Sequence, residues 1–214
     1  MMIRSSDSPD NRDDLLWQYK LYYDALGEVM GKLTKGLTRE RFDLVLKTLG
    51  LADDMPLVLR NDRLRAAIYD YAVFSDRLEG RTIFQQWLED FHQHQGDAVK
   101  AATSRLVEAL VENRFSVFDV EAVREGLGVD VRDVLCEQRL FVMDRLMSSN
   151  WRQGARFASR LIILPQFAMF TCEPIEAAVE HGEDLAGGTL GTAANQSNLQ
   201  AAAIEAFAKA LRSG

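Results

Sequence analysis

The sequence has few of the residues that build cofactor sites, disulfide frameworks or membrane spans. Its 214 residues include two cysteines, three histidines and four prolines. No apolar stretch approaches the roughly 18 residues that cross a bilayer. The N-terminal stretch MMIRSSDSPDNRDD lacks the apolar core of a signal peptide. These absences predict a cytoplasmic protein with no metal, no cofactor and no membrane partner.

The few cysteines and histidines do not form a reactive pattern. Cys136 and Cys172 lie in apolar, strand-like surroundings, which favours two buried free thiols over a disulfide. His92 and His94 are two residues apart and would point away from each other on a helix, so they cannot share one ion. No Gly-rich phosphate loop, G-x-S-x-G elbow or H-E-x-x-H pair is present. The sequence therefore assigns no catalytic residue and favours a non-catalytic protein over an enzyme.

Charge and size limit the class of protein further. The net charge is −7, which argues against a chain that wraps nucleic acid or an anionic membrane along its whole length. Hydrophobic residues make up 47% and charged residues 27%, both ordinary for a globular protein. A chain of 214 residues can form one compact domain or two small ones.

Hydrophobic residues recur at helical spacing through the first half of the chain. Residues 1–11 are polar and predicted to be disordered, and 12–113 are predicted to form a helical layer. Thr38 and Thr82 are typical helix N-caps, and Gln85 completes a T-x-x-Q capping box with Thr82. Helices are expected at 13–31, 37–50, 60–76, from 82 onward and at 97–113.

At Arg114 the period changes from 3.6 to 2, so 114–172 is predicted to be a small antiparallel β module. Gly126 and Gly128 can adopt positive φ and favour a hairpin turn with a bulge. Pro165 separates the last two strands, because proline cannot lie inside a central ladder. Strands are expected at 114–123, 129–135, 138–144, 154–164 and 166–172.

The helical period returns from Pro174, so residues 173–214 are predicted to form a C-terminal helical segment with a flexible linker at 186–198. Ile204 and Phe207 begin a thin apolar stripe that can dock on the body or pair with a second copy, docking being favoured. The predicted fold class is α+β: an N-terminal helical layer of about five helices, a small five-stranded antiparallel sheet or half-barrel, and C-terminal helices.

An ordered series of short motifs spans about residues 60–175. The motifs include a D-and-R turn with G-x-T opening the next helix, an F-S-V-F strand, a V-R-D-V-L strand and a late G-x-x-x-x-[AS]-R strand. They lie at Asp76, Arg77, Gly80, Thr82, Phe115 to Phe118, Arg132, Asp133, Leu135, Gly154 and Arg160. This series resembles the domain of an uncharacterised bacterial family whose members often carry a SEC-C zinc-binding tail.

The chain departs from that family at the tail. The SEC-C motif needs a cysteine-rich terminal cluster, which two separated cysteines and three histidines cannot supply. In proteins that have the tail, the resemblance implies a zinc knob that docks on protein-export or ribosome partners. For this chain the resemblance implies a fold only.

The candidate ligand-binding residues cluster in the β module. Arg145, Trp151, Arg152, Arg156 and Arg160 lie within sixteen residues, and 19 of the 25 basic residues in the chain are arginine. Small barrels bind single-stranded nucleic acid through arginine and aromatic side chains, which contact phosphates and stack on bases. The alternative interpretation is that these arginines form cross-strand ion pairs with acids such as Asp119 and Glu121.

Two other groups of charged residues are interpreted as structural rather than functional. Asp70, Asp76 and Glu79 form a loose acidic group at a helix turn, and no base accompanies them. Arg132 and Asp133 are adjacent on a strand, so they face opposite sides and should make separate structural contacts.

The leading functional hypothesis is a non-catalytic protein–protein interaction or regulatory module that binds a protein partner or forms a homodimer. Its working surface would be the sheet face or the Ala-rich C-terminal helix. The alternative is nucleic-acid binding through the arginine–tryptophan surface.

Overall fold

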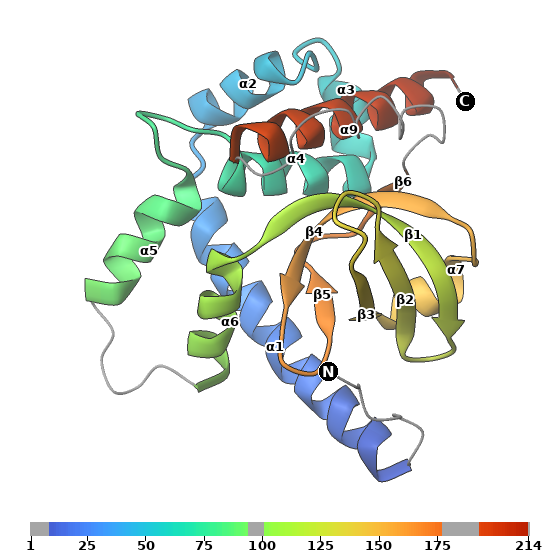
Figure 1. Cartoon of the computed structure of the whole chain (residues 1–214). Coiled ribbons are helices and arrows are strands. Elements are labelled where there is room, and N and C mark those ends of the chain that lie inside the picture. The colour runs from blue at the N-terminus through green and yellow to red at the C-terminus, as the bar shows by residue number, and fades with distance from the viewer. Residues whose placement is uncertain (1–8, 94–100, 177–192, 214) are drawn as a thin grey trace.

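The computed structural model describes residues 9–93, 101–176 and 193–213. Figure 1 shows α2, α3, α4 and α9 gathered over one side of a small β-barrel, while α1 runs past the barrel beside α6. No helix within these ranges is long and apolar enough to cross a membrane. The helices are α1 (Pro9–Lys35), α2 (Arg39–Thr48), α3 (Met55–Arg60), α4 (Asp62–Phe74), α5 (Ile83–Gln93), α6 (Ala101–Val111), α7 (Arg145–Asn150) and α9 (Ala193–Ser213).

Several residues predicted to begin or end helices do so in the structure. Thr38 is the N-cap of α2 and accepts a hydrogen bond from the Arg41 backbone N–H at 3.2 Å. Gly50 follows the end of that helix with φ of +66°, a conformation that glycine adopts without steric cost. Thr82 and Gln85 bond each other's backbone N–H at 3.0 and 3.1 Å, which confirms the capping box before α5.

Some helix boundaries differ from the sequence prediction. α1 begins at Pro9, inside the segment predicted to be disordered, and continues through Gly31 to Lys35. α3 is an additional helix, and its six residues are too few to display a hydrophobic period. The predicted helix at 97–113 is α6 from Ala101 onward, and its expected first turn lies outside the described residues.

The strands close into a barrel. β1 pairs with β2, β2 with β3, β3 with β5, β5 with β4, and β4 returns to β1. β6 pairs with β4 and adds a sixth strand to the sheet. The strands are β1 (Arg114–Arg124), β2 (Gly128–Asp133), β3 (Arg139–Met143), β4 (Arg156–Ile163), β5 (Ala168–Phe170) and β6 (Ile175–Glu176).

The prediction of a five-stranded antiparallel sheet or half-barrel is therefore wrong in three details. The sheet has six strands, five of them closed into the barrel, and it is mixed because β3 and β5 run parallel at Val142 and Ala168. The parallel pair forms because the chain crosses over between β3 and β5 by way of α7 and β4. Closure depends on which strand edges meet, and strand periodicity carries no information about that.

The C-terminal part also differs. Residues 175 and 176 form β6, where the period predicted a helix, and residues 177–192 lie outside the described residues. α9 begins at Ala193, inside the predicted linker 186–198, and it docks on α4 and β1. This confirms the favoured interpretation, in which the last helix docks on the body of the protein.

Strand β1 is buried on both faces and joins two cores. Phe115 and Val117 pack under the helical layer, whereas Phe118 and Val120 point into the barrel. This agrees with the two-residue period predicted from Arg114 onward, which a bulge between Val120 and Ala122 then interrupts. The barrel interior contains Phe118, Val120, Val129, Val131, Val142, Met147, Phe157, Leu161, Ala168 and Phe170.

Two glycines should respond in opposite ways to a methyl group. A Cβ on Gly128 would meet the Val142 carbonyl oxygen at 2.0 Å, a backbone atom on the neighbouring strand. A Cβ on Gly27 of α1 would meet nothing within 4 Å. We expect Gly128→Ala to lower the free energy of unfolding, because backbone must move, and Gly27→Ala to raise it by about 0.5–1 kcal/mol. Urea unfolding of both variants measures this, and a neutral Gly128→Ala would contradict the strand register.

Candidate functional site

The five residues predicted to form one arginine–tryptophan surface are in different settings. Arg145 is the first residue of α7, Arg152 lies two residues after its end, and both are exposed. Trp151 packs edge-on against Phe157, with ring centroids 4.8 Å apart. These three remain near the surface, but the other two arginines do not join them.

Arg156 and Arg160 lie on the same side of β4, as their spacing predicts, but the helical layer covers only one of them. Arg156 stays at the barrel surface, where it donates two hydrogen bonds to Asp119 at 2.6 and 3.0 Å. Arg160 is 3% exposed and lies beneath α4 and α9. The five residues therefore do not form one exposed surface, and nucleic-acid binding stays a prediction without a gathered arginine patch.

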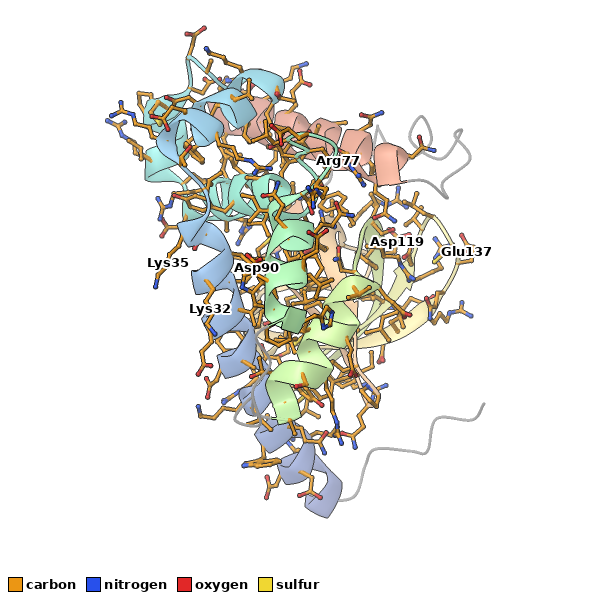
Figure 2. All side chains as sticks on the ribbon, turned by 90° about the vertical axis from the view of Figure 1, so that its left-hand side faces the viewer. Lys32, Lys35, Arg77, Asp90, Asp119 and Glu137 are labelled. Atoms are coloured by element: carbon orange, nitrogen blue, oxygen red, sulfur yellow. The ribbon has the colours of Figure 1, made fainter. Side chains whose placement is uncertain are left out.

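Ion pairs cover the outer face of the barrel. Figure 2 shows Asp119 and Glu137 on the barrel, on the side away from Lys32 and Lys35 of α1. Arg132 donates to both of these acids, at 2.8 Å to Asp119 and 3.0 Å to Glu137. The cross-strand pairing considered from the sequence is thus present. Further pairs are Arg139–Glu121 and Arg124–Asp130.

Asp133 faces the other way and is fully buried. It accepts hydrogen bonds from Ser116 at 2.6 Å and from Arg114 at 3.0 Å. Its Oδ1 also accepts from the backbone N–H of Leu135, so it fixes the turn after β2. Arg132 and Asp133 therefore make separate structural contacts, as the sequence predicts.

The most elaborate polar site of the described residues is buried between the helical layer and the barrel. Asp70 on α4 is 0% exposed, and Arg160 on β4 donates from Nε to its Oδ2 at 2.8 Å. Arg160 also donates to Asn113 at 2.6 Å and to Ser75 at 2.7 Å. Thr171 donates to the second carboxylate oxygen of Asp70. The pair is thus completed by neighbours from several elements, and its guanidinium also lies over the Phe74 ring.

Gln200 of α9 completes this cluster and is 1% exposed. Its Oε1 accepts from Arg160 at 2.6 Å and from Ser75 at 2.6 Å, while its Nε2 donates to Asp70 at 2.8 Å. Two donors face the amide oxygen and one carboxylate faces the amide nitrogen, so the site matches a carboxamide. Among the described residues, no buried side-chain polar atom lacks a hydrogen-bond partner.

The sequence analysis places Asp70 in a loose acidic group and Arg160 in the arginine–tryptophan surface, and it does not find Ser75, Asn113, Thr171 or Gln200. A weak signal existed, because Asp70 lies between residues of the α4 apolar stripe, next to Tyr71. The partners of Asp70 are 90 to 130 residues away along the chain, so the sequence cannot pair them. Asp76 binds Arg41 instead, at 3.1 Å, and Glu79 lies in the turn with φ of 54°.

The cysteines and His92 give no reactive site. Cys136 is exposed rather than buried as predicted, because it follows the end of β2 in a turn. Cys172 is partly buried, and both thiols are free. Burial, together with the Asp70 charge, raises the pKa of the Cys172 thiol well above its ordinary value, which disfavours a nucleophilic thiolate. In the ranges that the structure describes, no group of three or more His, Cys, Asp or Glu could hold a metal.

An open groove of about 310 Å³ lies between α1, α6 and the turn that joins β4 to β5. We call it the Trp17 groove, since Trp17 is 66% exposed and Leu21 is 36% exposed at its edge. Arg105 is the one charged residue in its lining, and it forms no ion pair with a described residue. The lining residues are Trp17, Gln18, Leu21, Tyr22, Ala101, Ala102, Arg105, Leu164, Pro165, Gln166 and Phe167.

A second, more open hollow of about 570 Å³ lies between the end of α1, α2 and α4. The two threonine hydroxyls in its lining already have local roles. Thr34 donates to the Met30 carbonyl and Thr38 caps α2. Neither this hollow nor the Trp17 groove is lined by a residue of the Asp70–Arg160 cluster.

The chain matches one family model. Residues 13–176, more than half of the chain, match a family of unknown function (DUF7986). No curated protein and no solved structure matches. The match carries no link to SEC-C proteins, so that resemblance stays a prediction.

The buried pair and a surface pair should differ in their effect on stability. We expect Asp70→Asn to lower the free energy of unfolding by about 3–5 kcal/mol, because Arg160 keeps its charge in a buried site. Arg156→Ala should lower it by only about 0.2–1 kcal/mol, since its pair with Asp119 is partly solvated. Equal losses in urea unfolding would contradict this distinction.

Asp119 should make stability depend on pH. Hydrogen bonds from Arg156, together with those from Arg132, hold the pKa of its carboxyl below the ordinary value. A carboxyl with a lowered folded-state pKa stabilises the fold above its unfolded pKa of about 3.9. That stabilisation is lost as pH falls through the folded pKa. We expect the stability difference between wild type and Asp119→Asn to be full at pH 7 and to shrink below about pH 4.

Urea unfolding at a series of pH values measures this difference. Asp53→Asn is the control, because Asp53 is exposed and forms no ion pair with a described residue. A difference for Asp119→Asn that stays constant down to pH 2 would refute the assignment.

Proposed function

We propose that this chain, which belongs to that family of unknown function, is a non-catalytic protein-interaction module whose partner binds in the Trp17 groove. The observation that supports the proposal is the exposure of Trp17 and Leu21 beside an apolar groove with one arginine, Arg105, which forms no ion pair with a described residue. Tryptophan and arginine are the residues most enriched among those that dominate binding energy at protein interfaces.

The groove has the apolar character of a helix-binding site. Leu21 lies one helical turn after Trp17, so both project from the same face of α1. Ala101 and Ala102 of α6 line the groove with small side chains, and Pro165 and Phe167 from the turn after β4 also line it. A groove between two helices with small residues on one wall accommodates the apolar face of an amphipathic helix.

The positive charge of Arg105 indicates the charge of the partner. The arginines on the outer face of the barrel are ion-paired, whereas Arg105 is exposed and unpaired within the described residues. An Asp or Glu of the partner would form an ion pair with Arg105 at the edge of the apolar contact. The expected partner is therefore an amphipathic segment with apolar anchors and an acidic residue.

The same residues give little support to catalysis. Arg105 is the only ionisable side chain of the lining apart from the Tyr22 phenol. A catalytic site needs converging groups that can donate, accept or attack. The polar cluster that has several such groups is buried, and its hydrogen bonds are already used within the protein.

A peptide selection tests the proposal without a known partner. Random 16-residue peptides displayed on phage are selected against the wild-type chain, and the enriched peptides are assayed by fluorescence anisotropy. We expect enriched sequences with spaced apolar residues and an Asp or Glu. Trp17→Ala should weaken them by about 30-fold or more, which corresponds to about 2 kcal/mol. Arg105→Glu should weaken the acidic peptides selectively.

Leu59→Ala is the matched control, because Leu59 is 62% exposed on α3, away from the groove. The proposal fails if no peptide is enriched, or if the enriched peptides bind Trp17→Ala as tightly as wild type. Sedimentation velocity over a range of concentrations examines a second copy as the occupant. A dimer abolished by Trp17→Ala would replace the acidic partner with self-association.

A further inference from the structure

The C-terminal helix lies outside the part of the chain that matches the family, yet it fills a buried site of that part. The family match ends at residue 176, and α9 begins at Ala193. Residues 177–192 are the only covalent connection between α9 and the family domain. α9 is therefore a segment that is covalently linked to the family domain but lies outside it in the sequence.

The apolar contact has the form of a helix in a groove. Buried α9 residues recur at the spacing of one helical face, and they pack on α4 and β1. Opposite them lie Ile68 and Tyr71 of α4 and Phe115 and Val117 of β1. The buried residues of α9 in this contact are Leu199, Ala203, Ile204, Phe207 and Ala208.

Gln200 adds a chemical requirement to this apolar contact. Leucine in its place would leave the Arg160 and Ser75 donors short of an acceptor in a buried site, and glutamate would set a carboxylate against Asp70. The carboxamide of Gln200 accepts from both donors and also donates to Asp70, which neither an apolar side chain nor a carboxylate can do. The groove therefore discriminates among helices at this one position.

Outside the buried apolar face, Arg212 pairs with Asp54 near the end of the helix, and Ser197 contacts the Ser75 carbonyl and the Tyr71 hydroxyl, both at 3.4 Å. The outward face of α9 carries Glu205 and Lys209, which are exposed. The helix thus has one specific face, as a bound peptide does.

We infer that the surface formed by α4, β1, β4 and β6 is a helix-binding site of the family domain, which this chain fills in cis with α9, and that Gln200 determines its specificity. The ligand class is an amphipathic helix with a small apolar stripe and one inward glutamine. Because α9 is covalently linked to the domain, its effective concentration at the site is high. A competing helix displaces it only when its affinity and concentration together outweigh that effective concentration. This site is distinct from the Trp17 groove and does not depend on it.

The first experiment cuts the tether in the full-length protein. A recognition site for a specific protease replaces part of residues 177–192, and the cleaved but otherwise complete protein is incubated with a fluorescent peptide of residues 193–213. We expect the peptide to exchange with the resident α9. A Gln200→Glu peptide should bind about a hundredfold more weakly or worse, because it buries a charge against Asp70.

The matched control is an Asn198→Asp peptide, which makes the same change of amide to carboxylate at an exposed position of the helix, outside the cluster. We expect it to bind within about threefold of the wild-type peptide, the range of a surface charge change. The inference is overturned if the resident α9 does not exchange, if cleavage unfolds the protein, or if the Gln200→Glu and Asn198→Asp peptides bind alike.

A second measurement uses the intact, uncut chain and does not rely on cleavage. Hydrogen exchange of α9 amides is compared with that of β1 and β4 amides at low urea concentrations. We expect α9 to exchange through a separate opening that exposes less surface than global unfolding. Identical rates and identical urea dependence for α9 and the barrel would show that α9 is an inseparable part of the core, and would overturn the inference.

Discussion

The buried ion pair between Asp70 and Arg160 is the interaction on which the arrangement of layers depends. Removing two charges from water costs several kcal/mol for each ion, so both must use their remaining hydrogen-bonding capacity within the protein. Their partners come from α4, β4, the segment after β5, α9 and the residue before β1. Apolar packing has little directionality, whereas these bonds fix the distance and orientation of each element.

The barrel supplies the rigid side of this arrangement. It is closed by one short parallel contact at Val142, and its strand β1 contributes to two cores at once. The inward face of β1 and β4 fills the barrel. Their outward face packs against the helices at one end of the strands and carries ion pairs at the opposite end. This division explains why Arg156 and Arg160, on the same side of one strand, have opposite environments.

The two surfaces proposed for binding follow from the same division. The helical layer leaves a groove over the barrel, and α9 covers it with an apolar stripe and a glutamine that matches the polar cluster. On the other side, α1 and α6 leave the Trp17 groove open, with Arg105 unpaired within the described residues. The site under α9 is covered and requires a matching polar side chain, which suits regulation. The Trp17 groove is open and mainly apolar, which suits the binding of a partner.

The sequence by itself determined the local features of this protein. The helical periods of the first half, the Thr38 and Thr82 caps, the turn at Gly126 and the two-residue period of β1 all arise from residues close together in the chain, and the structure has them. The helical period after Pro174 is an exception, because residues 175 and 176 pair with β4. The α+β class follows from the change of period at Arg114. Tertiary structure alone decided that the sheet closes, that Arg160 is buried and that Gln200 meets Asp70. Each depends on contacts between residues far apart in the chain, for which neither spacing nor composition carries a signal.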